Sequence, residues 1–163
     1  MKITELYKQI YRRFDNLTPI PFDCGELCGK LCCQGDDESG MYLFPGEELL
    51  FSGKDNFTVL PSEFISAGKP VQLLVCHGPC DRTERPLSCR IFPLIPYVKK
   101  GSALRIIPDP RASICPLTHP EAVGCSEKRF IREVRYAFRV LSKVPEVRTF
   151  LEDLSFLLDD FRL

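Results

Sequence analysis

The residues in this sequence best suited to chemistry are its nine cysteines. The first group lies within ten residues of the chain and is interspersed with glycines. The three groups are Cys24, Cys28, Cys32 and Cys33; Cys76, Cys80 and Cys89; and Cys115 and Cys125. Thiolates repel one another, and a soft or borderline cation compensates that charge and lowers the thiol pKa. The first group therefore favours a metal centre.

The number and context of the cysteines also bear on the compartment. Nine is odd, so complete disulfide pairing within one chain is impossible. Residues 1–14 lack the continuous apolar run and the small-residue cleavage site of a secretory signal. We therefore expect a reducing, cytoplasmic compartment, where clustered cysteines more often bind metal or do chemistry than cross-link the chain.

Other interpretations of the cysteines stay open. Cys76 or Cys125 taken alone could be an ordinary small buried residue. A redox centre has less support, because no two cysteines are separated by two residues. The neighbouring His77 and the Cys115-x3-His119 spacing allow a cysteine–histidine nucleophile, although proximity in sequence is not geometry. Adjacent side chains cannot point the same way from regular structure, so one cysteine of the 32–33 pair would serve a first site and the other a second site or the core.

The second group contains a further motif, in which Cys80 precedes Arg85-Pro86 and a Cys89-Arg90-x-Phe92-Pro93 run. With the first group, this motif resembles the YkgJ-type cysteine-cluster proteins, described as a zinc- or iron-chelating domain. The resemblance covers roughly residues 22–95 and implies metal binding, but it supplies no reaction. The six cysteines that match the family's pattern, and that the resemblance implies as ligands, are Cys24, Cys28, Cys32, Cys33, Cys80 and Cys89.

Four thiolates suit tetrahedral zinc, and the same ligands could hold an iron–sulfur cluster. We expect zinc in a mainly structural role, with the cluster as the alternative. An enzyme that uses an open position at the metal is the rival function. Cys115, His119 and Cys125 either complete a second site with spare thiols such as Cys76 or pack the loop, and we expect at most one of Cys115 and Cys125 to be a ligand.

Three arginines, Arg82, Arg85 and Arg90, flank the second group of cysteines. We expect them to balance the negative charge of a thiolate centre, with ordinary surface ion pairs as the alternative. The chain as a whole has 22 basic and 22 acidic residues, which argues against nucleic acid as a partner. No apolar run reaches the roughly 20 residues of a membrane span, so we expect no membrane partner. The sequence identifies no protein partner.

The elements that must position the cysteines follow from hydrophobic periodicity. Apolar residues at helical spacing predict a helix over residues 3–17 and a pair of antiparallel helices over residues 127–161. Strands are predicted near residues 41–44, 57–60 and 71–76, with a hairpin over 94–107. The 163 residues therefore predict a single α+β domain: a small irregular antiparallel sheet and a cysteine-rich loop packed on one N-terminal helix and a C-terminal helix pair.

Overall fold

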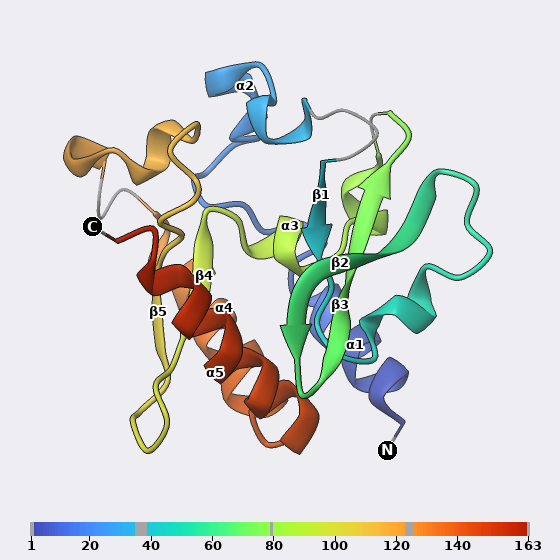
Figure 1. The fold of residues 1–163 in the computed structure, drawn as a ribbon. Helices are drawn as coiled ribbons and strands as arrows, with labels where there is room; N and C mark the ends of the chain where they lie inside the picture. The colour runs from blue at the N-terminus through green and yellow to red at the C-terminus, as the bar shows by residue number, and fades with distance from the viewer. Residues whose placement is uncertain (1, 35–38, 79, 123–125, 163) are drawn as a thin grey trace.

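The computed structural model describes residues 2–34, 39–78, 80–122 and 126–162 of the chain, which form an α+β fold (Figure 1). The α-helices are α1 (Ile3–Arg12), α2 (Gly25–Cys28), α3 (Leu87–Ile91), α4 (Lys128–Leu141) and α5 (Pro145–Asp159). The strands are β1 (Gly40–Tyr42), β2 (Phe57–Ser66), β3 (Lys69–Cys76), β4 (Leu94–Tyr97) and β5 (Arg105–Pro108). Single turns of 3₁₀ helix are η1 (Leu31–Cys33), η2 (Glu47–Leu50), η3 (Arg82–Glu84), η4 (Pro116–Thr118) and η5 (Pro120–Ala122).

The strands form two small antiparallel sheets rather than one. The first has the order β1-β3-β2, and the second is the β4–β5 hairpin. Both hairpin strands contain a proline, Pro96 and Pro108, which cannot donate to a ladder and therefore confines such strands to sheet edges. In the larger sheet Cys76, the last residue of β3, pairs with Phe57, the first residue of β2.

The two C-terminal helices are confirmed, and the N-terminal helix is shorter than expected. α1 ends at Arg12, and residues 13–16 continue as turns, although Phe14 and Leu17 remain buried. The amide of Phe14 bonds to the carbonyl of Tyr11, and Nη1 of Arg90 donates to that same carbonyl at 3.3 Å. The bond from Phe14 spans three residues and tightens the last turn, and Arg90 satisfies the same end carbonyl a second time.

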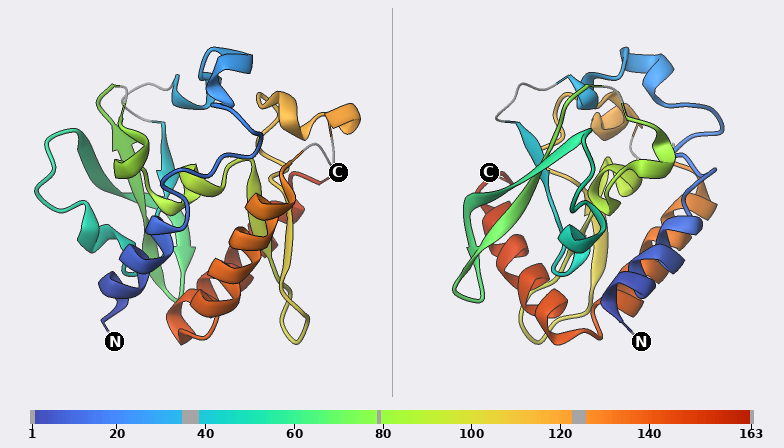
Figure 2. Two further views of the ribbon diagram at one scale, coloured as in Figure 1. Left: turned by 180° about the vertical axis from the view of Figure 1, so that it is seen from behind. Right: turned by 90° about the vertical axis from the view of Figure 1, so that its right-hand side faces the viewer.

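The core lies between the helices and the two sheets. α4 and α5 run in opposite directions from residues 142–144 and diverge, with α4 beside α1 and α5 against the sheets (Figure 2). Phe44 fills the space between them, with its ring centroid 5.0 Å from that of Phe138 and 5.4 Å from that of Phe150. These elements form a rigid base beneath the cysteine-bearing loops.

A second, smaller hydrophobic cluster lies under the larger sheet. Leu43, Phe51, Phe57 and Leu74 form it, and Cys76 and Cys80 pack against its edge. Among the described residues, no helix is both long enough and apolar enough to cross a membrane.

Candidate functional site: a thiol-rich end of the molecule

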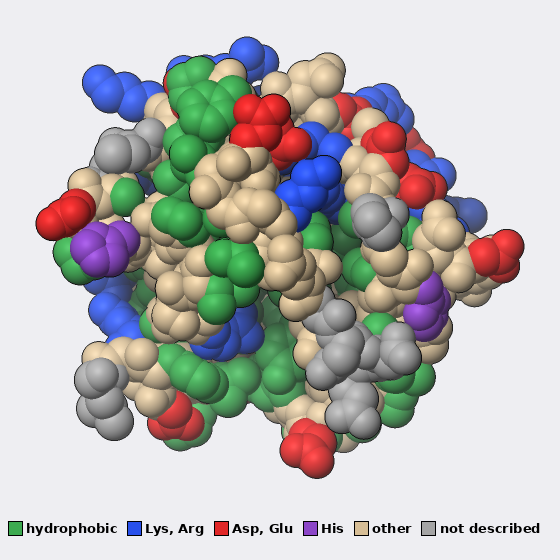
Figure 3. All heavy atoms as spheres, turned by 90° about the horizontal axis from the view of Figure 1, so that it is seen from above, with side chains coloured by type: hydrophobic (Ala, Val, Ile, Leu, Met, Phe, Trp, Pro, Cys, Tyr) green, Lys and Arg blue, Asp and Glu red, His purple; other side chains and the backbone are tan. Residues whose placement is uncertain are grey.

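Eight of the nine cysteines lie within the described residues, and none of these eight is in a disulfide. They are carried by the α2–η1 segment, the end of β3 with the loop that follows it, α3, and the loop before η4, which gather at one end of the molecule (Figure 1). Figure 3 looks onto this end, where hydrophobic side chains are exposed between charged groups. Cys125 lies outside the described residues.

The segment that carries the first four cysteines has no hydrophobic anchor of its own. No residue from 21 to 34 is buried, and neither α2 nor η1 contributes a side chain to the core. Gly29 and Lys30 adopt left-handed backbone angles, with φ of 60° and 59°, and separate the two short helices. Because of this break, Cys24, Cys28 and Cys32 do not share the face of one continuous helix.

Cys33 and Cys89 meet at a cavity of about 410 Å³, and Arg85 lies with them in its wall. Burial raises the pKa of Cys89 to about 12, and the neighbouring charge of Cys33 raises it further. A hydrogen bond from Cys32 lowers the pKa of Cys33, so in this adjacent pair Cys33 ionises first. The structure thus brings the two sequence motifs together, because Cys33 comes from the first and Cys89 from the second.

Cys76 and Cys80 form a second thiol pair beside Cys33 and Cys89. Cys76 donates a hydrogen bond to Cys80 and thereby lowers the pKa of Cys80, which the guanidinium of Arg85 lowers further. The charges of Cys33 and Cys89 act on Cys76 as well. A thiolate with a lowered pKa is the form that binds metal.

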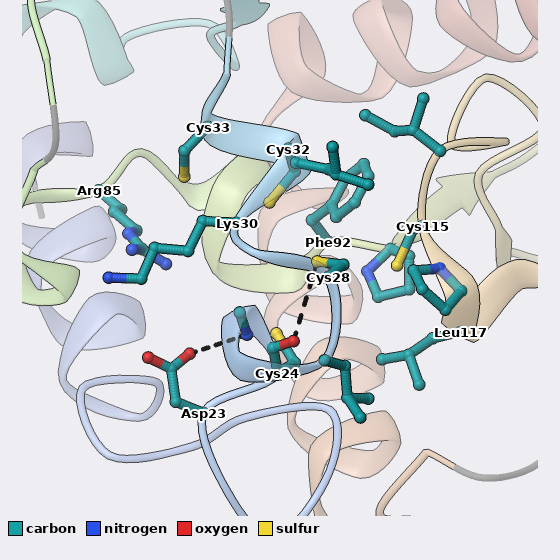
Figure 4. Close-up of a pocket in the computed structure, with 16 residues that line it drawn as sticks. Asp23, Cys24, Cys28, Lys30, Cys32, Cys33, Arg85, Phe92, Cys115 and Leu117 are labelled. Atoms are coloured by element: carbon teal, nitrogen blue, oxygen red, sulfur yellow. Dashed lines mark hydrogen bonds between the residues drawn. The ribbon is translucent and has the colours of Figure 1, made fainter.

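Cys24, Cys28 and Cys115 lie on the other side of η1. They line a small cavity of about 30 Å³, which Cys32 and Cys33 also line. In Figure 4 the sulfurs of Cys28 and Cys115 face the same space, whereas Cys33 lies apart from them beside Arg85 and Lys30. Burial raises the pKa of both Cys24 and Cys115, and each is raised further by the neighbouring charge of Cys28.

The three arginines expected at the thiols have separate roles. Arg85 lies against Cys33, Cys80 and Cys89, and its buried Nε has no hydrogen-bond partner among the residues that the structure describes. Arg82 donates to the carbonyl of Leu17 and lies 3.7 Å from a carboxylate oxygen of Asp23. The expectation for Arg90 is wrong, because its guanidinium is directed toward α1 and not toward the thiols.

Arg90 is 2% exposed, and its guanidinium contacts both the loop before α3 and the end of α1. Nε donates to the carbonyl of Arg85 at 2.7 Å, Nη2 donates to the carbonyl of Thr83, and Nη1 lies 2.8 Å from Oδ1 of Asp15. The guanidinium carbon also lies 4.2 Å from the ring centroid of Tyr11. Arg90 therefore ties the segment that carries Arg85 to the end of α1.

The two histidines lie at opposite edges of the thiol end (Figure 3). His77 Nε2 lies 2.5 Å from Oγ1 of Thr58, and His119 Nδ1 accepts from the amide of Glu121 at 3.4 Å. Neither contact places an imidazole between the thiols. A cysteine–histidine nucleophile therefore has no support from the geometry of the described residues.

Glu47 is a buried carboxylate beneath the thiol-rich end that the sequence did not single out. Its carboxylate is fully buried and accepts from the amides of Phe44 and Leu87, at 3.0 and 2.6 Å, and from the hydroxyl of Tyr11. Leu87 begins α3, so Glu47 positions the helix that carries Cys89. The carboxylates after Pro45 predict only the start of a helix, and no local pattern points to a partner forty residues away.

The buried carboxyl of Glu47 predicts a pH dependence of stability. Burial raises its pKa from 4.5 to about 7, so folding favours the protonated form. The stability that the protonated carboxyl contributes is fully present below about pH 4.5, its pKa in the unfolded chain. It is lost as the pH rises through about 7, its pKa in the folded chain. We expect the free energy of unfolding of the wild type to fall, relative to Glu47→Gln, by on the order of 2 kcal/mol between about pH 5 and about pH 8.

Urea unfolding of both proteins at the two pH values measures this difference. Glu63→Gln, which changes an exposed carboxylate, is the matched control and should follow the wild type at both. A gap between wild type and Glu47→Gln that is the same at both pH values would show that Glu47 does not titrate in this range.

The described thiols are gathered but are not arranged as a completed metal site. In the described ranges, no three histidine, cysteine, aspartate or glutamate side chains are placed so that they could hold one ion as they stand. Zinc–sulfur bonds are about 2.3 Å long, so a bound metal would have to draw the sulfurs inward. Residues 22–34 have no buried anchor that opposes such a movement.

Comparison of the chain with protein-family models, with curated proteins and with solved structures finds no match in any of the three.

Proposed function

We propose that this protein binds a thiophilic metal through its cysteine cluster, and that the metal mainly builds the fold of the thiol-rich end. Zinc is the proposed metal, and an iron–sulfur cluster is the alternative. The observation that carries the proposal is the gathering of eight free thiols, from separate parts of the chain, at one end of the molecule. We also propose that residues 22–95 form a YkgJ-type cysteine cluster and that the protein acts in the reducing cytoplasm.

The energetics of the cysteine segment support a metal. Ordering one residue of backbone costs roughly 1–2 kcal/mol, and residues 21–34 bury no side chain that would offset this cost. A bound metal adds its binding free energy to folding, as in small metal-dependent domains. When bound, zinc or a cluster would supply four strong sulfur bonds that tie this segment to α3.

The charge around the thiols supports the same proposal. Hydrogen bonding lowers the pKa of Cys33 and of Cys80, so each thiol pair contains one member that ionises readily. Arg85 lies beside both, and one of its buried nitrogens is without a partner in the described part of the chain, which suits a group that balances a thiolate centre of net negative charge. Cys24, Cys28, Cys32, Cys33, Cys80 and Cys89 are the proposed ligands.

Analysis of metal and acid-labile sulfide in anaerobically purified protein tests the proposal. We expect at least one equivalent of zinc per chain and no visible absorption, whereas iron with sulfide would favour the cluster. The matched control replaces Cys24, Cys28, Cys80 and Cys89 with serine and should lose the metal. Equal trace metal in the two proteins would refute metal binding.

A second candidate function is an enzyme that uses an open position at the metal. One observation favours it: the 410 Å³ cavity beside Cys33 and Cys89 is within the size range of ligand pockets and has walls that include Phe44 and Phe150. Four protein ligands would close the site, whereas three ligands and a water would leave it open. Azide added to the cobalt-substituted protein distinguishes them, because only an open position lets azide change the cobalt spectrum.

A further inference from the structure

The described cysteines lie in two neighbourhoods around the Cys32–Cys33 dipeptide, whose two residues line both cavities. The inner set lies around Arg85 and α3 and comprises Cys33, Cys76, Cys80 and Cys89. The outer set lies around the 30 Å³ cavity and comprises Cys24, Cys28, Cys32 and Cys115. Each set contains one cysteine outside the sequence motifs, Cys76 in the inner set and Cys115 in the outer.

The inner set consists of two neighbouring pairs of cysteines. Cys33 and Cys89 share the wall of the larger cavity, and Cys76 and Cys80 pack on the edge of the same small hydrophobic cluster. Every pair within the set interacts electrostatically, including Cys33 with Cys76 and Cys80 with Cys89. Arg85 provides the positive charge on this side.

The outer set lines the smaller cavity, and its member Cys32 is exposed. A volume of about 30 Å³ is enough for one water-sized sphere, which is the scale of a single ion. Cys24 and Cys28 reach this cavity from the two ends of α2, Cys32 from η1 and Cys115 from the loop before η4. The apolar side chains of Leu27, Leu31 and Ile114 lie in the same wall.

The local backbone explains why the division falls within one dipeptide. Successive residues of a 3₁₀ helix project about 120° apart, since there are three residues per turn. Cys33 therefore lies on the side of Arg85 and Lys30, whereas Cys32 lies nearer Cys28 (Figure 4). The adjacent residues Cys32 and Cys33 therefore point toward different groups of cysteines, although they belong to one turn of the chain.

We propose that the thiol-rich end holds two separate four-cysteine metal centres, with Cys76 completing the inner one and Cys115 completing the outer one. This inference rests on the proposed metal-binding function and extends it to two ligands that the motifs do not include. Four cysteines are the ligand set of a closed zinc site and also of an iron–sulfur cluster, so the division holds for either occupant.

Anaerobic titration of the reduced, metal-free full chain with Co²⁺ tests the division, in competition with a chelator that sets the free metal concentration. We expect the wild type to bind two equivalents with thiolate-to-cobalt absorption. Cys76→Ser and Cys115→Ser should each weaken one equivalent more than roughly tenfold, since even partners outside the ligand set change affinity by 10- to 100-fold. The double variant should weaken both.

Cys125→Ser is the matched control, because the proposal leaves that cysteine without a role, and it should bind two equivalents as the wild type does. The far-ultraviolet circular dichroism of the whole chain, to which the two longest helices α4 and α5 contribute most, shows whether each variant is folded. A single equivalent in the wild type, weakened alike by Cys76→Ser and by Cys115→Ser, would overturn the division and leave the proposed function intact. Loss of an equivalent in Cys125→Ser would also overturn it, whereas no Co²⁺ binding by the wild type would overturn both proposals together.

Discussion

A strong chelator is expected to lower the melting temperature of this protein by roughly 10 °C or more. A metal that binds only the folded chain stabilises it by about 4 kcal/mol at a free concentration about 1,000 times its dissociation constant. For a chain of this length, about 1 kcal/mol corresponds to a shift of roughly 2–4 °C. Calorimetry before and after chelation, followed by addition of zinc, measures the effect.

The loss of stability should be local before it is global. The amides of residues 22–34, which have no buried side chain, and those of residues 76–92, which carry the facing thiols, should exchange hydrogen first when metal is removed. The amides of α4 and α5 should stay protected longer, because Phe138, Phe150 and their neighbours form a core without cysteines. A variant with Cys24, Cys28, Cys80 and Cys89 replaced by serine should not respond to chelator. Unchanged exchange of the cysteine segments after metal removal would contradict this prediction.

Replacing Arg90 with methionine is expected to cost about 3–5 kcal/mol of unfolding free energy. The guanidinium is almost fully buried, and it binds the carbonyls of Tyr11, Thr83 and Arg85 and the carboxylate of Asp15. Methionine fills similar space but donates nothing, so three carbonyls lose a donor and an ion pair loses its cation. The side chain of Asp15 is 34% exposed and can be solvated, so the cost comes mainly from the three carbonyls, at about 1–3 kcal/mol for each buried group left without a partner.

Urea unfolding measures the change, and two further variants interpret it. Arg129→Met removes an exposed arginine of α4 and should unfold at the wild-type midpoint. Arg90→Lys keeps the charge but cannot reach all of the acceptors with one ammonium group, so it should lie between Arg90→Met and the wild type. If Arg90→Met and Arg129→Met have equal midpoints, the Arg90 contacts contribute nothing to stability.

Much of the fold was predictable, because hydrophobic periodicity reports local structure directly. The stripes through Phe130 and Phe138, and through Phe150 and Leu158, predict two helices that the structure confirms as α4 and α5. The hairpin over residues 94–107 is confirmed as β4 and β5 for the same reason. The end of α1 was not predictable, since Arg90, nearly eighty residues away, contributes to it through the carbonyl of Tyr11.

The candidate site, like the fold, was predictable from the sequence only in part. The sequence by itself determined that many thiols occur, that six of them lie in two motifs, and that a metal would compensate their charge. Only the tertiary structure decided that Cys76 and Cys115 join them, that Arg85 and not Arg90 faces them, and that a buried Glu47 holds α3. The physical reason is that spacing describes neighbours along the chain, whereas a site depends on the order of strands and the packing of loops, which residues far apart decide together.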